Sequence, residues 1–512
     1  MRTGDDMEKC RHRALSTGGG RGPAAGYSEP TVRPSRGGRM KFGHGLLPVA
    51  LAPLLLSIGS VEAQQSPVRA WREGREREIL EEFFQLLRIP NIASDEANIR
   101  RNAEMLSAMF RNRGFTVDAS DGPGAPVVLA QLDAEPSRGT ILFYIHYDGQ
   151  PVNPAEWTHC GPFEPCLVTP SGAIELDASG ARFDPDWRVY ARSSSDDKGP
   201  IVALLNAVDA LRAIGQRPAW SMRVVLDGQE EAGSANFGRF MVERGDALDA
   251  DLAITLDGPR HPSGRPTIYH GVRGQAALTL TVFTARSDLH SGNYGNWAPD
   301  PSIQLGRLLS SMKDEEGNIL IDGFHDDVIP LTPAEREALE AIPDIEASLA
   351  DAFGIAQPER AAKRLELKLN QPTLNVLAME SGGGLSAPAR TAIPAFARAR
   401  ISMRMVNGLD PARQTELVAE HVRSQGYHVV LDRDPTDEER KRYPLLARID
   451  AGSGTRAARV TMESWISATV AGALTVDGVP PVRLPTLGGS LPFTEFSEGL
   501  GDPHGGRVAG ES

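Results

Sequence analysis

Hydrophobic and polar residues follow two different periods along the first half of the chain. Apolar residues recur with a helical period in residues 73–88, 98–113, 199–214 and 234–244. Short apolar runs with the composition of strands lie between them, at residues 127–132, 141–147, 222–226 and 252–256. Strands that alternate with helices predict an α/β fold, in which helices cover both faces of a sheet.

The pattern changes near Thr267. Strands are predicted at residues 276–283, 373–377, 397–405 and 427–431, and helices at residues 301–312 and 411–425. Two strand–helix–strand halves of this kind predict a small ferredoxin-like α+β domain. Its middle carries a polar, charged insertion, residues 313–370, which we expect to be helical. A helix at residues 463–474 and a short strand then return to the first domain.

The N-terminus has the pattern of a processing signal. Residues 1–39 are rich in Gly, Arg and Pro and have no apolar period, which is typical of a disordered or untranslated leader. Met40 and Lys41 then precede an apolar run, residues 46–58, that ends in small residues at Ala63. This is the pattern of a secretory signal peptide, and the run is too short to span a membrane. We therefore expect export to the periplasm or medium, cleavage near Ala63, and no membrane segment in the mature form.

Length, charge and cysteine content narrow the alternatives. A chain of 512 residues is too long for one ordinary core, so two domains are expected. The net charge of −13 argues against nucleic acid as a partner. Beyond the leader only Cys160 and Cys166 remain. In an oxidising compartment they could close a small loop, and two free buried thiols are an equal alternative.

Candidate chemistry gathers where the predicted strands of the first domain end. His146 and Asp148 close one strand, two residues apart and therefore on one side of it. The other acidic residues follow the same layout, each beside a predicted strand or helix start: Asp196, Asp197, Glu230, Glu231 and Asp257. Each alone could be a strand-end or helix cap. Adjacent carboxylates repel unless a cation lies near, so the set predicts a metal site along one sheet edge.

These segments also resemble a known family. The motifs HYDGQP, SSSDDKG, GQEEAGS and LDG resemble, in order and spacing, those of the M20 metallopeptidases, and the resemblance covers nearly all of residues 75–495. This family holds carnosinase-like dipeptidases, carboxypeptidase G, aminoacylase and succinyl-diaminopimelate desuccinylase. The family usually has glycine where this chain has Ser193, and we expect the serine to be tolerated.

The resemblance implies a fold with two domains. It is a zinc-exopeptidase-like α/β catalytic domain in two parts, residues 64–266 and 437–512, with an inserted ferredoxin-like dimerisation (lid) domain, residues 267–436. It also implies a homodimer.

The resemblance further implies two divalent metal ions, zinc first and manganese or cobalt as alternatives. His146 and Asp257 would hold one ion, Glu231 the other, and Asp196 would bridge both. The peptide bond between Asp196 and Asp197 would be cis. Two neighbouring metals do require a bridging carboxylate, which agrees with this assignment.

Other roles are also carried by the resemblance. Asp148 would orient His146, which suits the need of a ligating imidazole for a fixed partner. Of the adjacent glutamates only one can coordinate while the other faces the substrate, and the residues alone do not say which. The resemblance makes Glu230 the general base. His290 would stabilise the oxyanion from the partner subunit.

Three further residues would line the substrate pocket. Arg404 would grip the substrate carboxylate, a task suited to a planar guanidinium. Asn375 and Ser490 match positions nearby. The resulting hypothesis is hydrolysis of a dipeptide or small peptide with a free carboxylate. The alternatives are deacylation of N-acyl amino acids by the same chemistry and a catalytically impaired relic.

The relic hypothesis comes from the C-terminal pattern. The family has a further histidine ligand some tens of residues beyond the segment 488–492, whereas here the family pattern ends near Phe496 and a Gly-rich run follows. His504 is the one candidate substitute, in a wrongly spaced segment. We therefore expect a truncated C-terminus that leaves one metal with only Asp196 and Glu231. Such a chain would bind about one metal per subunit, fold marginally and be nearly inactive.

Overall fold

The computed structural model describes residues 66–120, 124–179, 183–359, 364–382 and 391–491. The fold below is that of the unit beginning at Gln65. The predicted leader, the signal peptide and His504 lie outside the described residues. Of the helices in the described ranges, none is long and apolar enough to cross a membrane.

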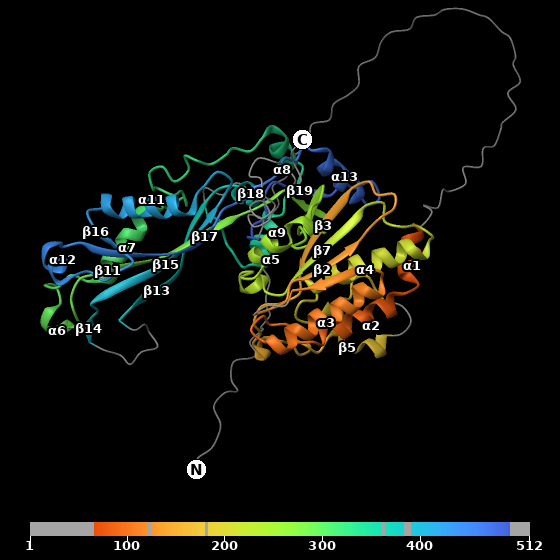
Figure 1. Ribbon diagram of the computed structural model, residues 1–512. Helices are drawn as coiled ribbons and strands as arrows, with labels where there is room; N and C mark the ends of the chain where they lie inside the picture. The colour runs from red at the N-terminus through yellow and green to blue at the C-terminus, as the bar shows by residue number, and fades with distance from the viewer. Residues whose placement is uncertain (1–65, 121–123, 180–182, 360–363, 383–390, 492–512) are drawn as a thin grey trace, which may run out of the picture. The chain divides into compact units, whose positions relative to one another are not determined.

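The first sheet is mixed and has five strands in the order β1-β2-β7-β3-β8 (Figure 1). Their bounds are β1 (Thr116–Ala119), β2 (Val128–Leu132), β3 (Thr140–His146), β7 (Ser221–Asp227) and β8 (Leu252–Thr255). Strand β3 runs parallel to both β7 and β8, whereas β2 is antiparallel to β7 and β1 to β2. The carboxyl ends of β7, β3 and β8 therefore meet at one edge of the sheet.

Helices cover both faces of this sheet, as the alternating pattern predicts. One face packs against α2 (Glu76–Leu87), α3 (Glu96–Asn112) and α4 (Lys198–Ala213), whose Phe84, Leu106 and Leu205 share a core with Ile145. The other face packs against α5 (Phe237–Arg244), where Phe237 joins Leu142 and Tyr144. Successive β3 side chains thus enter opposite cores. The remaining helix at this end of the chain is α1 (Pro67–Glu73).

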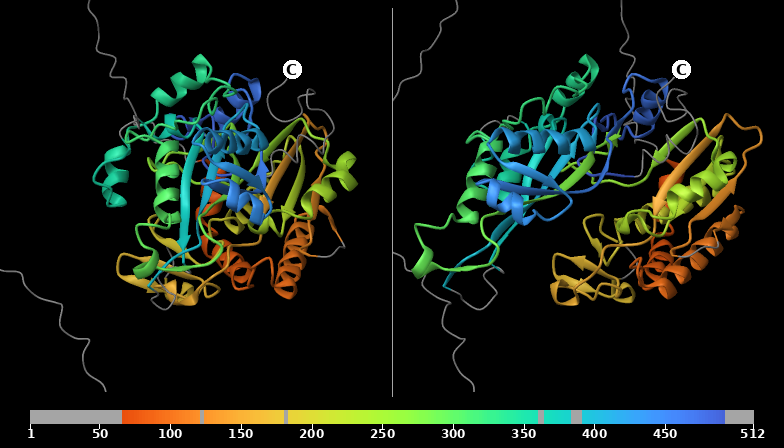
Figure 2. Two further views of the ribbon diagram at one scale, coloured as in Figure 1. Left: turned by 90° about the vertical axis from the view of Figure 1, so that its left-hand side faces the viewer. Right: turned by 60° about the vertical axis from the view of Figure 1, so that its left-hand side comes forward.

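The second sheet has five strands in the order β13-β15-β11-β17-β16. These strands are β11 (Gly274–Phe283), β13 (Thr373–Ser381), β15 (Phe396–Met405), β16 (His428–Leu431) and β17 (Leu446–Thr455). Helices α7 (Pro301–Met312) and α11 (Pro411–Ser424) share one core with them (Figures 1 and 2). Along β15, Ala399, Ile401 and Met403 enter this core, while Arg400 and Ser402 between them lie on the opposite face. Among the described residues, helices therefore cover this sheet on one face only.

Strand β17 lies beyond residue 436, where we expected the chain to return to the first domain. It pairs with β11 from Leu446 to Thr455, and Ile449 lies in the core of the second sheet. The expected boundary is therefore too early. The second half of β17, Asp450-Ala-Gly-Ser-Gly-Thr455, reads as a loop in the sequence because glycine, serine and aspartate are depleted in strands.

Several smaller sheets and strand pairs supplement the two large sheets. A three-stranded sheet contains β4 (Cys166–Thr169), β5 (Gly172–Ile174) and β6 (Arg188–Tyr190). Cys160 and Cys166 form a disulfide, which decides between the two alternatives that the sequence left open. Two-stranded pairs are β9 (Thr267–Tyr269) with β19 (Val482–Leu484), β10 (Gly271–Val272) with β18 (Ala458–Arg459), and β12 (Leu289–His290) with β14 (Ala392–Ile393).

Short helices complete the described chain. The insertion at residues 313–370 contains α8 (Pro333–Glu340), α9 (Glu346–Ala352) and α10 (Leu365–Lys368). The others are α6 (Ser291–Tyr294), α12 (Asp437–Arg442), α13 (Trp465–Ala473) and the 3-10 turns η1 (Pro154–Glu156), η2 (Leu176–Ser179), η3 (Glu230–Ala232) and η4 (Gly245–Leu248).

His270 lies between β9 and β10, and its side chain contacts both α13 and β19. Its Nε2 lies 2.7 Å from the Ser467 hydroxyl of α13, and its Nδ1 lies 3.2 Å from the carbonyl oxygen of Leu484 in β19. Arg483 also donates to the Ser467 hydroxyl, at 3.0 Å, so that hydroxyl is free to donate to a neutral imidazole. Burial lowers the pKa of His270 to about 4, and the charge of Arg483 acts in the same direction.

We predict that His270 makes the fold sensitive to mild acid. The unfolded imidazole binds a proton below about pH 6.5 while the folded one stays neutral down to about pH 4, so stability falls as the pH drops through this window. The loss should reach about 3 kcal/mol. His270→Gln should flatten the dependence of unfolding free energy on pH, as measured by urea denaturation between pH 7.5 and 4.5. Equal slopes for the variant and the unaltered chain would contradict this prediction.

Candidate metal centre

The predicted metal ligands meet at the carboxyl edge formed by β7, β3 and β8. His146 is the last residue of β3 and is the register partner of Asp227, the last residue of β7. Asp257 follows β8, and Glu231 lies in η3, just after β7. Asp196 comes from the loop before α4. The parallel register of three strands thus gathers residues from four separate segments of sequence.

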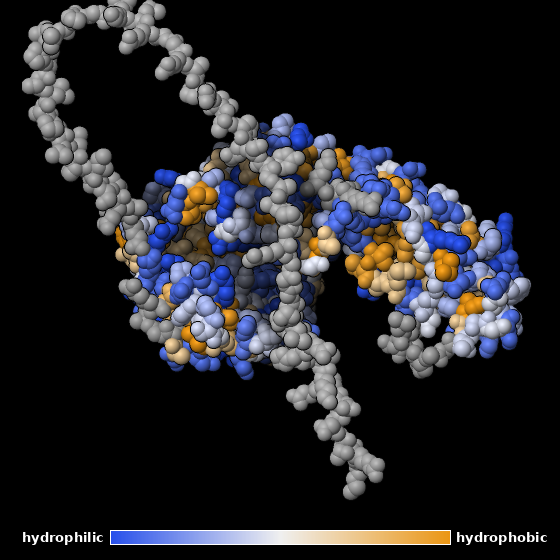
Figure 3. Space-filling model, turned by 180° about the vertical axis from the view of Figure 1, so that it is seen from behind, coloured by the Kyte–Doolittle hydropathy of each residue, from blue (hydrophilic) through white to orange (hydrophobic). Residues whose placement is uncertain are grey.

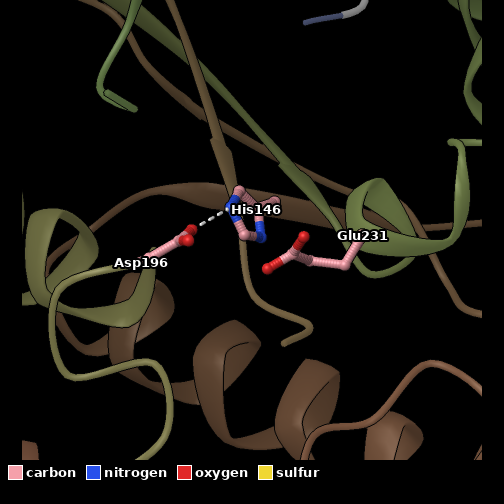
Figure 4. A group of neighbouring side chains, drawn as sticks. All are labelled: His146, Asp196 and Glu231. Atoms are coloured by element: carbon pink, nitrogen blue, oxygen red, sulfur yellow. Dashed lines mark hydrogen bonds and ion pairs between the residues drawn. The ribbon is translucent and has the colours of Figure 1, made fainter. Parts of the chain in front are cut away.

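Two groups of potential ligands share His146. His146, Asp196 and Glu231 form one group, and His146, Asp197 and Asp257 form the other, each with ligand atoms within 4.8 Å of one another. Figure 4 shows the first group, in which the Glu231 carboxylate approaches His146 from the side opposite Asp196. The imidazole Nε2 lies 2.8 Å from Asp196 Oδ1 and 3.8 Å from Asp257 Oδ2.

One aspartate beyond the expected ligand set joins these groups. Asp197, which was given no metal role, groups with His146 and Asp257, while Asp196 groups with His146 and Glu231. The bridging role of Asp196 stays a prediction. Asp197 is buried, and its Oδ2 accepts the backbone N–H of His146 at 3.3 Å. The Asp196 side chain is 63% exposed. The peptide bond between the two aspartates is cis, as the resemblance implies.

The charges of the site fit a divalent cation. Burial raises the pKa of Asp257 and of Glu231, and other carboxylates nearby add to each shift. Burial lowers the pKa of His146, but the adjacent carboxylates of Asp148 and Asp196 more than offset this and leave it well above its usual value. One imidazole therefore faces a surplus of negative charge. A divalent ion would relieve this repulsion, and nitrogen with carboxylate oxygen is a donor set that zinc accepts.

Asp148 binds two parts of the site together. It is fully buried, and its two oxygens accept the backbone N–H groups of Glu230 and Glu231 at 3.0 and 3.1 Å. Its Oδ1 also lies 3.3 Å from Nδ1 of His146, within ion-pair range but outside hydrogen-bond geometry. Asp148 thus lies where an orienting partner of His146 must lie, and it also fixes the backbone of both glutamates.

Two of the candidate substrate residues, Arg404 and Asn375, lie on the open face of the second sheet. Arg404 in β15 donates from Nη1 to the Ser490 hydroxyl at 2.9 Å. Asn375 in β13 pairs with Ser402, two residues before Arg404, and is exposed. His290 is exposed and accepts the N–H of Gly292. Within the described residues it forms no hydrogen bond or ion pair with the other candidate site residues.

Comparison with known proteins agrees with this geometry. The chain matches peptidase family M20/M25/M40 over residues 142–504. It belongs to this family. The match continues past Phe496, where the motif pattern was expected to end, and takes in His504.

Named relatives of this M20 chain include dipeptidases. The human Beta-Ala-His dipeptidase is 28% identical over 347 residues, which are 66% of this chain and 64% of the relative. The Cys-Gly metallodipeptidase of Schizosaccharomyces pombe is 28% identical over 310 residues, 60% of this chain and 62% of the relative. The chain thus spans a little under two thirds of the length of these relatives.

Solved structures show the same fold. An M20 family metallo-carboxypeptidase from Sulfolobus solfataricus has 29% sequence identity and a TM-score of 0.66, covering 83% of this chain and 89% of that one. Human carnosine dipeptidase 1 has 21% identity and a TM-score of 0.62, covering 85% of this chain and 90% of that one.

Ser193 departs from the usual M20 glycine, and its backbone explains why glycine suits the position. Its φ is 60°, in the left-handed region that costs most residues roughly 1–2 kcal/mol. Its buried hydroxyl accepts from Asn91 Nδ2 at 2.9 Å and donates to the carbonyl oxygen of Asp148 at 3.4 Å. Those hydrogen bonds offset part of the strain.

Asn91 and Lys198 form buried hydrogen bonds beside the site, and neither periodicity nor motif spacing predicts these contacts. Asn91 Nδ2 also donates to the carbonyl oxygen of Tyr147 at 2.8 Å, across more than fifty residues of sequence. Lys198 is buried, donates to the carbonyl oxygens of Leu86 and Ile89, and has its pKa lowered by burial to about 7. Asn91 thus joins the end of β3 to the loop before α4, and Lys198 joins the start of α4 to the end of α2.

We predict that two substitutions at Ser193 change the unfolding free energy by different amounts. Ser193→Ala keeps the left-handed strain and removes the buried hydroxyl, so unfolding free energy should fall by about 1–2 kcal/mol. Ser193→Gly also removes the hydroxyl but relieves the strain, so it should be more stable than the alanine variant by about 1 kcal/mol. Chemical denaturation of the three proteins measures both differences. An alanine variant as stable as the glycine variant would refute the role given to φ.

Proposed function

We propose that this chain hydrolyses the amide bond of a dipeptide or small peptide that carries a free carboxylate, with divalent metal as cofactor. The observation that carries the proposal is the meeting of His146 with Asp196, Glu231 and Asp257 at one sheet edge. Family membership supports peptide hydrolysis. The relatives named as dipeptidases favour dipeptides over N-acyl amino acids.

The adjacent glutamates suit different tasks. Glu231 belongs to a ligand group and accepts from Gln150 Nε2 at 2.5 Å. Glu230 belongs to neither group, and burial raises its pKa to about 8, with Asp257, Glu231 and Asp148 adding to the shift. A carboxylate that binds protons near neutral pH and is not a ligand suits general-base catalysis.

Each of the candidate site residues has a separate role in the proposed reaction. A bound divalent ion would lower the pKa of water and polarise the substrate carbonyl, with zinc first and manganese or cobalt as alternatives. Glu230 takes the proton of the attacking water and delivers it to the leaving nitrogen. Arg404, held by Ser490, receives the substrate carboxylate, while Asn375 lies on the same face of the sheet.

We predict that Glu230→Gln lowers kcat about a thousandfold on dipeptides and leaves bound metal unchanged, because proton transfer is lost while the ligands remain. Glu231→Gln should instead lose metal. Turnover of a dipeptide and N-acyl amino acid panel by the zinc- or manganese-loaded protein, with metal content by mass spectrometry, measures both effects. Equal metal loss in the two variants would contradict the assignment, and turnover of N-acyl amino acids alone would contradict the substrate class.

We further propose that two copies of the chain form a homodimer through the second sheet. Strand β13 is an edge strand, and its residues 375–379 are all exposed, including Val376, Leu377 and Met379. Unpaired edges with apolar side chains favour association with another chain. The loop after His290 adds Tyr294 and the 79% exposed Trp297. Figure 3 shows apolar side chains gathered on the surface of this part of the molecule.

His290 in such a dimer would serve the active site of the partner and stabilise the oxyanion. We predict that mixing inactive His290→Ala with inactive Glu230→Gln subunits regains part of the activity, because each mixed dimer contains one site with both groups. Adding Leu377→Glu to both chains, which charges the exposed edge, should abolish the recovery and yield monomers in light scattering. No recovery despite verified subunit exchange would count against action in trans.

We also propose that the protein is exported. The disulfide between Cys160 and Cys166 supports an oxidising compartment, in which such bonds persist. The pattern that ends at Ala63 has the composition of a signal peptide.

A further inference from the structure

Asp227 is a buried carboxylate beneath the turn that carries Glu230. It ends β7 and is 1% exposed. Its Oδ1 accepts the N–H of Gln229 at 2.9 Å, and its Oδ2 accepts the hydroxyls of Tyr144 at 3.0 Å and Ser234 at 2.7 Å. Within the described part of the chain no lysine, arginine or histidine forms an ion pair with it. A buried carboxylate without a cation depends on its hydrogen-bond donors.

Two of the residues that donate to Asp227 flank Glu230, the proposed general base, in the sequence. Gln229 immediately precedes Glu230, and Ser234 closes the same turn, with its N–H donating to the carbonyl oxygen of Gln229 at 2.8 Å. Asp148 holds the N–H groups of Glu230 and Glu231 from the other side. The turn from 228 to 234 is therefore held by two buried carboxylates.

Tyr144 connects this turn to the strand that carries His146. It lies in β3, two residues before His146, and is 1% exposed. Its ring packs against Phe237 with centroids 5.1 Å apart. The hydroxyl therefore has a fixed position, and it fixes Asp227 in turn. A simple turn cap would use one oxygen of an aspartate. Here the second oxygen receives two hydroxyls, one of them from the neighbouring strand.

We propose that Asp227, with Tyr144 and Ser234, is a positioning residue that sets the place of the Glu230 carboxylate relative to His146. The inference rests on the proposed role of Glu230 as general base. Since a displacement of about 1 Å in a catalytic group can cost about a hundredfold in rate, loosening this turn acts on kcat more than on substrate affinity.

The experiment uses the zinc-loaded full chain and a dipeptide that it hydrolyses. Tyr144→Phe and Asp227→Asn should each lower kcat at least about tenfold, while KM and bound metal change less than about twofold. Tyr427→Phe is the matched control, because it removes a tyrosine hydroxyl that donates to the carbonyl oxygen of Gln304 in α7, away from the candidate metal centre, and it should leave kcat unchanged. In the Glu230→Gln background, Asp227→Asn should add less than about a twofold loss. An equal loss in both backgrounds would overturn the proposal.

Amide hydrogen exchange gives a second readout that does not depend on activity. Asp227→Asn and Tyr144→Phe should speed exchange at Gln229, Glu230 and Glu231 at least about tenfold and leave β11 and β15 unchanged. Unchanged exchange in this turn would overturn the positioning role even if kcat falls. If the unaltered chain hydrolyses no peptide, the proposed function fails, and the exchange result still decides whether Asp227 holds the turn.

Discussion

The candidate site depends on one fully buried carboxylate, that of Asp148. Its oxygens hold the backbone of Glu230 and Glu231, and one of them lies beside the imidazole of His146. These groups come from strand β3 and from the turn after β7, so the Asp148 side chain connects two segments of the site directly. Removing it would leave two N–H donors without their acceptor and the imidazole without its nearby carboxylate, which is costly inside a protein. The fold itself therefore determines the relative positions of these site residues.

Electrostatics oppose this arrangement until a cation is bound. Burial and mutual repulsion raise the pKa values of Asp197, Glu230, Glu231 and Asp257 and so favour their protonated forms. The metal-free protein therefore binds protons that a metal ion would displace. Packing must offset that repulsion. The strands that deliver the ligands are enclosed by helices on both faces, and the hydrophobic contacts of β3 and β7 provide this stabilisation.

Sequence patterns predict the elements better than the connections between them. Strands β3, β7 and β8 and the helices between them follow from apolar periodicity, and their polar ends indicate where chemistry gathers. Strand β17 escaped because glycine and serine fill its second half. The roles of Asn91 and Asp227 escaped for another reason, since their partners include residues dozens of positions away. The place of Asp197 beside Asp257 depends on the path of a loop, which no period encodes.

The one-sided burial of the second sheet has a consequence for how such a chain can diversify. Alternate residues of β15 either build the core or face outwards, so Arg398, Arg400 and Ser402 can be exchanged with little effect on the packing beneath them. The first sheet gives no such freedom, because both of its faces are enclosed. New preferences for ligands can therefore arise by mutation on one sheet, while the chemistry of the other stays fixed. A library restricted to the outward positions of β13 and β15 would sample this route.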